Sequence, residues 1–415
     1  YPPLINVQPD NADPMIMPLH FRHTAILFLK VCPALSPLQK TDDPYAQAKS
    51  VRALVHFDLV KVYGMPYSFD NGASMGVPIV TTPIDPLNAS AIPGRNTVAE
   101  VYTQIVKDLT EAIDSKALNV SKSAGDNQGF IDEWAAKALL TRVYIYMGKN
   151  QEALDMAKNI IENSPYSLWT KAQYANAWDK NNANHINEMI FELVNSGSDD
   201  WADREGIAYL YHEDGYADAI CTKSFVDMLA QDPSDVRLDV ILPVQLKTDD
   251  NGKPTDMYKT YGDNRIFINK FPMGSLGDMR LNNLPILRLS EVYLNAAEAA
   301  AKLNDKTSTA KYLNEIIKNR TDDTKQLVTE STATLERVLL ERRKELVGEG
   351  QRFFDAMRNN ETVTRYTNED EKGWHYSINK ESQVFDRTYF RTILPIPVSE
   401  TNANPTLKAQ QNPGY

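Results

Sequence analysis

The sequence predicts a mainly α-helical protein in which helix pairs stack into a superhelix that carries a large loop-rich insertion. Two observations point to this fold class. In the flanking parts of the chain, apolar residues recur every three to four positions, which is the spacing of one face of an α-helix. Residues 166–283 lack this period and are rich in Tyr, Trp, Asp, Asn and Gly. We therefore expect helices to form a frame and loops to form the insertion.

Composition limits the classes of function to consider. The chain has 415 residues, of which 42% are hydrophobic, so it is long enough for a large buried core. Its formal net charge is −11, and it has no Lys/Arg-rich run that could neutralise a phosphate backbone. No stretch approaches the roughly 20 apolar residues of a membrane helix. We expect no nucleic-acid partner and no membrane-spanning segment.

The N-terminal part begins irregularly and then becomes helical. Prolines recur throughout residues 1–44, and at this density they prevent long helices; only residues 20–30 could form a short one. From Tyr45 an apolar stripe with helical spacing runs toward Gly64, a residue type that commonly ends helices. We predict one long helix there. Residues 66–95 then form a loop rich in Gly, Pro, Asn and Ser, and a loop of this length is usually functional or disordered.

The next helices have the pattern of helical hairpins. Thr97 and Glu100 have the spacing of a capping box, so a helix begins after Thr97. Helices are also expected at residues 132–147 and 151–161, with Gly148 at the turn. This hairpin resembles one tetratricopeptide unit, because small residues stand where its two helices would touch. A second hairpin is predicted later in the chain. Its helices cover residues 292–300 and 310–317, and several such pairs predict an α-superhelix.

The insertion and the C-terminal part contain fewer regular elements. We expect a short strand at residues 188–194 and a short helix at residues 225–230, with loops elsewhere in the insertion. A long helix with the charged run 341–346 is predicted at residues 335–346. The final stretch is interrupted by prolines and is expected to be extended.

No motif predicts catalysis, a metal or a cofactor. Residues 72–76 match the string G-x-S-x-G, but a nucleophile elbow needs a helix directly after it, and Pro78 and Pro83 follow instead. Residues 249–252 resemble the start of a calcium loop without its closing Glu, so a turn is expected. The six histidines show no shared metal-ligand spacing. We predict no catalytic residue, no metal ligand and no cofactor.

Aromatic residues outside the helical stripes predict a ligand site. Flat rings cover the apolar C–H faces of sugars, while neighbouring carboxylates, amides and guanidinium groups bind sugar hydroxyls. This combination occurs in the first long loop and in the middle of the insertion. The candidate ligand-binding residues are Tyr67, Phe69, Asn71, Asp199, Asp200, Trp201, Arg204, Tyr209, Tyr211 and Tyr216.

Four segments, in this order, resemble one protein family. They are RALVHFDLVKVYG at residues 52–64, PILRLSEVYLNAAEA at residues 285–299, the run from ERRKEL to EGQRFFD with Arg358 at residues 341–358, and the close from LPIP to QNPGY at residues 394–415. With them the chain looks like the SusD/RagB family of bacterial surface lipoproteins, over about residues 45–165 and 280–415.

The resemblance implies a single SusD-like unit over residues 1–415. Its parts would be a tetratricopeptide-like helical frame at residues 45–165 and 284–358, a variable ligand-binding region at residues 166–283, and an extended C-terminal segment at residues 359–415 packed on the frame. The matched charged residues are predicted to be structural, forming ion pairs on and between helices. These residues are Glu341, Arg342, Glu345 and Arg352, and Asp355 with Arg358.

The resemblance also implies a function, a location and a partner. Family members bind glycans, or in some cases peptides, at the outer face of the outer membrane without cleaving them. They pass the ligand to a SusC-like TonB-dependent transporter and are held by an N-terminal lipid anchor, which we expect to lie outside this sequence. Cys32 does not fit such an anchor, because Lys30 disrupts the small-residue box before it. Cys32 is therefore predicted to be an ordinary buried thiol.

Three other functions remain open. The chain could be a peptide-binding member of the same family. It could be a tetratricopeptide-type scaffold that binds protein partners on its helical face. It could also be a glycoside hydrolase, since a catalytic carboxylate pair cannot be picked from sequence among 55 acidic residues. The predicted helical pattern argues against this last function.

Overall fold

The structure is a computed structural model that describes most of the chain. The described residues are 43–81, 93–178, 185–195, 206–211, 215–216, 219, 221–241, 267–268, 270–271, 278–365 and 378–415. The helix expected at residues 20–30, the thiol of Cys32 and the turn expected at residues 249–252 lie outside them.

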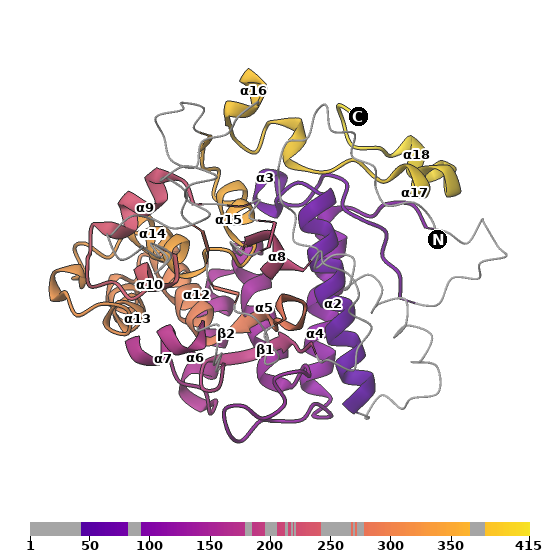
Figure 1. The fold of residues 1–415 in the computed structure, drawn as a ribbon. Coiled ribbons are helices and arrows are strands. Elements are labelled where there is room, and N and C mark those ends of the chain that lie inside the picture. Colours follow the sequence, from indigo (N-terminus) through magenta and orange to yellow (C-terminus); the bar gives the residue numbers. More distant parts are fainter. Residues whose placement is uncertain are drawn as a thin grey trace.

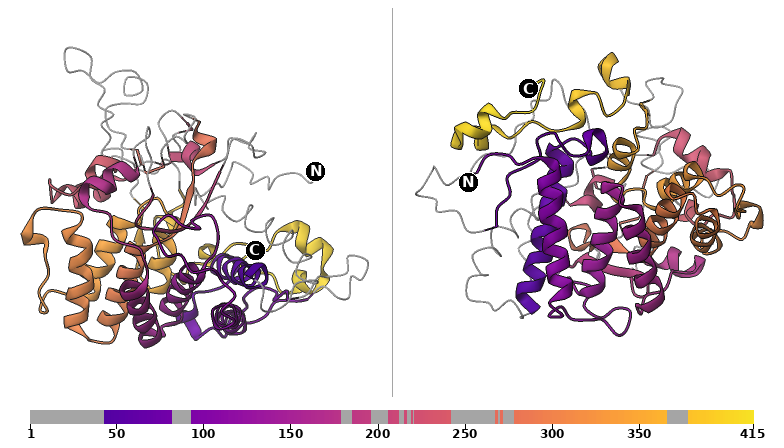
Figure 2. Two further views of the ribbon diagram at one scale, coloured as in Figure 1. Left: turned by 90° about the horizontal axis from the view of Figure 1, so that it is seen from below. Right: turned by 180° about the vertical axis from the view of Figure 1, so that it is seen from behind.

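A row of helices forms the frame, as the sequence predicted (Figure 1). Each helix packs on the next in the order α2, α4, α5, α6, α12 and α13, and α14 packs on α12. Viewed from below, these helices follow one another across the molecule from indigo to orange (Figure 2, left). Their bounds are α2 Asp43–Tyr63, α4 Val98–Asp114, α5 Glu133–Met147, α6 Asn150–Asn163, α12 Leu289–Lys302, α13 Lys306–Lys318 and α14 Leu335–Glu345.

Local sequence signals set the ends of these helices. The Thr97 hydroxyl accepts a hydrogen bond from the Glu100 backbone N–H at 3.2 Å, and the Glu100 carboxylate accepts one from the Thr97 N–H at 2.8 Å. This is the predicted capping box at the start of α4. At the end of α5, Gly148 adopts a left-handed conformation with φ 71°, which favours glycine.

Small residues bring the two halves of the frame together. Ala153 and Ala157 of α6 are fully buried, as are Ala296 and Ala300 of α12. These two helices pack directly on each other although they lie far apart in the sequence. Alanine has no side chain beyond Cβ, so the two backbones can approach closely across this contact.

A two-stranded antiparallel ribbon closes the insertion. It pairs β1 (Met189–Leu193) with β2 (Leu284–Arg288), and Leu193 lies opposite Leu284. The sequence predicted β1 but not β2, which leads directly into α12. The ribbon holds the two ends of the intervening segment side by side.

Short helices of the insertion surround a second hydrophobic core. It contains Trp169, Trp178, Phe225 and Leu229, with Phe271 from a separate stretch of the chain. The helix predicted at residues 225–230 is α9, while the others were not predicted. The helices are α7 Lys171–Ala177, α8 Ile207–Tyr211, α9 Lys223–Ala230, α10 Leu238–Ile241 and the 3-10 helix η4 Met279–Leu281.

The C-terminal segment runs along one side of the frame and is drawn in yellow across the top of Figure 1. Buried Arg95 holds it there by donating to the Gln410 carbonyl at 2.7 Å and the Asn412 side chain at 2.8 Å. Arg95 also donates to the Tyr63 carbonyl at 2.9 Å, at the end of α2. The remaining elements are α3 Tyr67–Asp70, η5 Thr324–Gln326, α15 Arg352–Arg358, β3 Val363–Thr364, α16 Lys380–Gln383, β4 Val384–Phe385, η6 Phe390–Thr392, α17 Val398–Ala403 and α18 Pro405–Ala409, with β3 paired to β4.

The G-x-S-x-G string is not a nucleophile elbow. Residues 72–76 follow the short helix α3, and residues 77–81, the described stretch directly after them, form no helix. Met75 instead forms an isolated antiparallel bridge with Thr97. The structure therefore agrees with the prediction that this match is accidental.

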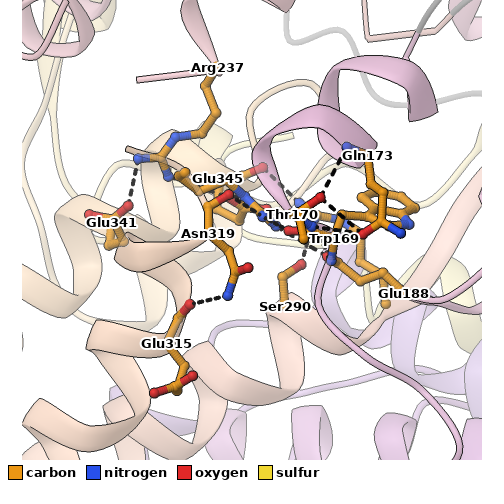
Figure 3. A network of polar contacts seen from close by, with 12 residues as sticks. Trp169, Thr170, Gln173, Glu188, Arg237, Ser290, Glu315, Asn319, Glu341 and Glu345 are labelled. Atoms are coloured by element: carbon orange, nitrogen blue, oxygen red, sulfur yellow. Dashed lines mark hydrogen bonds and ion pairs between the residues drawn. The ribbon is translucent and has the colours of Figure 1, made fainter. Parts of the chain in front are cut away.

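A buried ion network joins the insertion to the frame. Glu345 of α14 pairs with Arg288 at 2.7 Å, Arg320 at 2.9 Å and Arg237 at 3.2 Å. Glu188, just before β1, pairs with Arg288 at 2.8 Å and Arg320 at 3.2 Å. Figure 3 shows Arg237 extending from the insertion to Glu341 of the same helix. Burial alone would raise the pKa of Glu345, but Arg320 and Arg288 hold this pKa well below its usual range.

The predicted structural role of the matched charged residues is confirmed. Arg342 pairs with Asp355 at 2.7 Å and with Glu291 of α12 at 3.2 Å. Asp355 also pairs with Arg358 at 2.7 Å. Arg352 pairs with Glu361 at 2.7 Å. The two pairs of Arg342 hold α12, α14 and α15 together.

Candidate functional site

Two tyrosines of the insertion form a partly exposed aromatic pair. The rings of Tyr209 in α8 and Tyr216 lie 5.7 Å apart at an interplanar angle of 43°. Half of Tyr216 is exposed to solvent. Both are candidate residues from the sequence, and the structure brings them together.

The backbone at Gly215 creates this pair. The Tyr216 N–H donates to the Tyr209 carbonyl at 2.6 Å, so the chain turns back onto α8. A Cβ at Gly215 would clash with that carbonyl oxygen and lie 2.9 Å from the Tyr209 Cα. Only glycine therefore permits this close approach.

An ion pair lies beside the aromatic pair. Arg280 and Asp278 of the η4 segment, which packs on α8, are paired at 2.5 Å and are both partly exposed. The hydrogen bond to Asp278 is the main cause of the raised pKa of Arg280, and nearby Tyr209 contributes to it. The site thus combines two flat rings with a guanidinium group and a carboxylate. Sequence reasoning missed Arg280 and Asp278, because no periodic pattern places η4 next to α8.

Tyr211 points into the second core. Its ring stacks on Phe271 with centroids 5.7 Å apart and an interplanar angle of 18°. Burial, with a smaller contribution from Cys221, raises the pKa of Tyr211 to about 12. Tyr211 therefore packs α8 onto the second core, whereas the exposed ring of the aromatic pair is that of Tyr216.

The candidates Tyr67, Phe69 and Asn71 form a separate group at α3. Tyr67 packs edge-on against Tyr102 at 5.3 Å. Phe69 is 41% exposed, and the Arg387 guanidinium lies 5.5 Å from its ring centre. Asn71 is exposed and adopts a left-handed conformation with φ 57°.

Hydrogen bonds fix the α3 group on the frame. The Ser68 hydroxyl donates to the Arg358 carbonyl at 2.7 Å and accepts from Arg387 at 3.1 Å. Arg387 was not a candidate, because it lies more than 300 positions from Phe69 and only the fold joins them. The α3 group packs on α5 and α15, whereas α8 packs on η4, so the two aromatic groups have different surroundings.

Four candidates cannot be placed. Asp199, Asp200, Trp201 and Arg204 lie outside the described residues.

The described part of the chain contains neither a metal-binding cluster nor a membrane-spanning helix. Within the described residues, no three His, Cys, Asp or Glu side chains are arranged to hold a metal ion. No helix in the same residues is both long and apolar enough to cross a bilayer.

Two family models together match residues 33–415 of the chain. A model described as the SusD family matches residues 116–415, and one described as "Starch-binding associating with outer membrane" matches residues 33–145. A solved structure of a putative sugar binding protein from Bacteroides vulgatus ATCC 8482 is 36% identical, with a TM-score of 0.80, and covers 95% of this chain and 85% of that chain.

Two further relatives agree with these matches. The structure of a SusD superfamily protein from Bacteroides thetaiotaomicron VPI-5482 is 38% identical, with a TM-score of 0.78, and covers 95% of this chain and 83% of that one. SusD-like protein P25 from Formosa agariphila is 23% identical over an alignment of 418 positions that covers 90% of this chain and 73% of that protein.

Proposed function

The chain belongs to the SusD family, and from this premise we propose that it binds glycans at the outer cell surface and delivers them to a SusC-like TonB-dependent transporter. It performs no cleavage. The description of one matching family model as starch-binding and associated with the outer membrane supports this proposal. The description of a 36% identical relative as a putative sugar binding protein supports it too.

The observation that carries the proposal is the partly exposed pair of Tyr209 and Tyr216 beside Arg280 and Asp278. Two rings at 43° form a bent platform that fits the curved face of an oligosaccharide. The guanidinium group donates hydrogen bonds to sugar hydroxyls, and the carboxylate accepts them. The site residues of the proposal are this group, the α3 group and the residues Asp199, Asp200, Trp201 and Arg204.

We assign ligand recognition mainly to residues 166–283 and support of that region to the helical frame. The C-terminal segment, residues 359–415, completes the frame. An N-terminal lipid anchor holds the protein at the outer membrane, as in the family. The alternative is a peptide-binding member of the same family.

Calorimetry with a panel of soluble α-glucans, β-glucans, xylans, mannans and a set of peptides tests the proposal. We expect at least one glycan to bind and Tyr216→Ala to weaken it about tenfold, because one stacking ring is lost. Phe130→Ala is the matched control, since Phe130 is 62% exposed and lies outside the site. Peptide binding without glycan binding would favour the alternative. Release of shorter sugars from the bound glycan would contradict the non-catalytic function.

The transporter contact needs a separate measurement. We expect the lipid-anchored protein to co-purify with a TonB-dependent barrel from outer-membrane extracts, identified by mass spectrometry. Recovery of the protein alone, under mild detergent that preserves other outer-membrane complexes, would contradict delivery to such a partner.

A further inference from the structure

Arg387, which lies beside the α3 group, differs in its pairing from Arg280 of the aromatic pair. Arg280 is neutralised by Asp278 at 2.5 Å. Among the described residues, no carboxylate forms an ion pair with Arg387, and its hydrogen-bond acceptor is the Ser68 hydroxyl at 3.1 Å. Arg387 is also partly exposed. A guanidinium group has five N–H donors, so Arg387 can still donate to a ligand that arrives from solvent.

The two segments that meet at Arg387 fix its position. The C-terminal segment passes beside α3 (Figure 1). In it, Asp386 Oδ1 accepts hydrogen bonds from the Thr388 N–H at 2.8 Å and the Thr388 hydroxyl at 2.6 Å, which closes a turn around Arg387. These bonds lower the pKa of Asp386, to which Arg387 makes a smaller contribution. On α3, the Ser68 hydroxyl is held in turn by its donation to the Arg358 carbonyl. A guanidinium group fixed in this way loses little conformational freedom when a ligand binds.

Phe69 places an apolar surface next to this charge. The Arg387 guanidinium lies 5.5 Å from the centre of the Phe69 ring, within the range of a cation–π contact. Phe69 is nevertheless 41% exposed, so Arg387 covers only part of it. The α3 group therefore combines a fixed positive charge with an open aromatic face.

We propose that the α3 group, with Arg387, binds the anionic substituent of an acidic glycan, a uronate carboxylate or a sulfate ester. Two oxygens of such a substituent match the N–H fork of Arg387, and a charge-assisted hydrogen bond is roughly twice as strong as a neutral one. The sugar ring that bears the substituent contacts the exposed part of Phe69. The aromatic pair, whose Arg280 is neutralised, suits neutral sugars instead. This inference rests on the proposed glycan-binding function and names the ligand class of one part of its site.

Pairs of glycans that differ only in charge test the preference by calorimetry on the full chain. Polygalacturonate is compared with its methyl-esterified form, and a sulfated galactan with its desulfated form. We expect the anionic member of at least one pair to bind about tenfold more tightly than its neutral counterpart. This advantage should shrink as NaCl rises from about 50 to 500 mM, because salt screens exposed charges. A preference within only one pair identifies the substituent as carboxylate or sulfate, whereas equal affinities within both pairs would overturn the subsite.

Arg387→Gln removes the charge and keeps a polar side chain. We expect it to bind the anionic glycan about tenfold more weakly, with little change in its affinity for the neutral counterpart or in its melting temperature. Arg387→Lys should recover only part of the loss, because lysine keeps the charge but lacks the fork. Arg391→Gln is the matched control, since Arg391 belongs to the same segment but lies 5.3 Å from the centre of the Phe390 ring.

The outcomes separate this inference from the proposed function. Wild-type affinity of Arg387→Gln for the anionic glycan, or an equal loss in Arg391→Gln, would overturn the subsite, because the attraction would then not depend on the position of Arg387. Binding of a neutral glycan without binding of either anionic one would also overturn the subsite and leave the proposed function standing. If no glycan of either kind binds, both fail.

Discussion

At the scale of single residues, the candidate site depends on a backbone contact that side-chain chemistry does not predict. The sequence predicted that Tyr209 and Tyr216 belong to a site, because flat rings beside polar groups suit sugars. It could not predict that they face each other, since this depends on the turn at Gly215. Tyr211, chosen by the same reasoning, packs into the second core. Residue type therefore identified candidates, while burial decided their orientation.

Gly215→Ala should separate the two tyrosines. The added Cβ would clash with the Tyr209 carbonyl oxygen, so the chain at residues 215–216 must move. We expect glycan affinity to fall about tenfold, with little change in the melting temperature. Gly206→Ala, just before α8, is the control, because a Cβ there meets nothing within 4 Å. Equal affinities of the two variants would show that the turn does not position the site.

His56 should make stability depend on pH. Burial lowers its pKa from 6.5 to about 4, so the folded state binds its proton less readily than the unfolded state. Its Nε2 accepts from the Val80 N–H at 3.3 Å, a bond that the protonated ring cannot accept. Between pH 6.5 and pH 4 the unfolded state binds more protons, so stability falls as pH falls.

Urea unfolding at several pH values measures this effect. In the wild type, His56 should contribute a loss of up to about 3 kcal/mol in the free energy of unfolding between pH 6.5 and pH 4. In His56→Gln the free energy of unfolding should not show this loss between pH 6.5 and pH 4. The steeper loss of stability below pH 4.5, which comes from buried carboxylates such as Glu291, should remain. Identical slopes above pH 4.5 in both proteins would rule out His56 as the cause.

At the scale of elements, helices of the frame were predictable and the short elements were not. Long helices repeat their apolar spacing over several turns and carry local start and stop signals. The four-residue helix α3 is too short to show a period and lies within a predicted loop. Strand β2 includes Pro285 and was missed, because its pairing with β1 is formed across more than 90 intervening positions.

The capping box of α4 gives a direct test of a local signal. Thr97→Ala removes the hydroxyl that accepts from the Glu100 N–H, and we expect it to lower the free energy of unfolding by about 1 kcal/mol. Thr103→Ala on the exposed face of the same helix should change it by less than about 0.5 kcal/mol. Chemical denaturation measures the free energy of unfolding of both variants. Equal losses in the two variants would contradict a capping role for Thr97.

At the scale of the whole molecule, two hydrophobic cores are joined by buried charge. The first core belongs to the frame, and the second lies between the short helices of the insertion. Glu345, Arg288, Arg320, Arg237 and Glu188 connect them, with side chains that are at most 2% exposed. The sequence predicted that Glu345 forms structural ion pairs but could not identify its partners Arg237, Arg288 and Arg320, which come from three distant segments.

Glu345→Gln should destabilise the protein strongly. The substitution removes the carboxylate charge that three buried guanidinium groups share. We therefore expect a loss of about 3–5 kcal/mol in the free energy of unfolding. Glu315→Gln is the control, since Glu315 forms an exposed pair with Lys318 and should change stability by less than about 1 kcal/mol. Denaturant titration gives both values. A loss for Glu345→Gln as small as that of the control would mean that the network contributes little.

The β1–β2 ribbon defines two positions at which the segment between the strands could be exchanged for that of a related protein. Because Leu193 and Leu284 lie opposite each other, the segment between them leaves and re-enters the frame at one point. Replacement of the segment between these two positions keeps the ribbon but removes Arg237, which pairs with Glu341 and Glu345 of α14, so the new segment must supply an equivalent cation. The same geometry makes Leu193 and Leu284 the positions at which the corresponding segment of a relative can be joined to this frame.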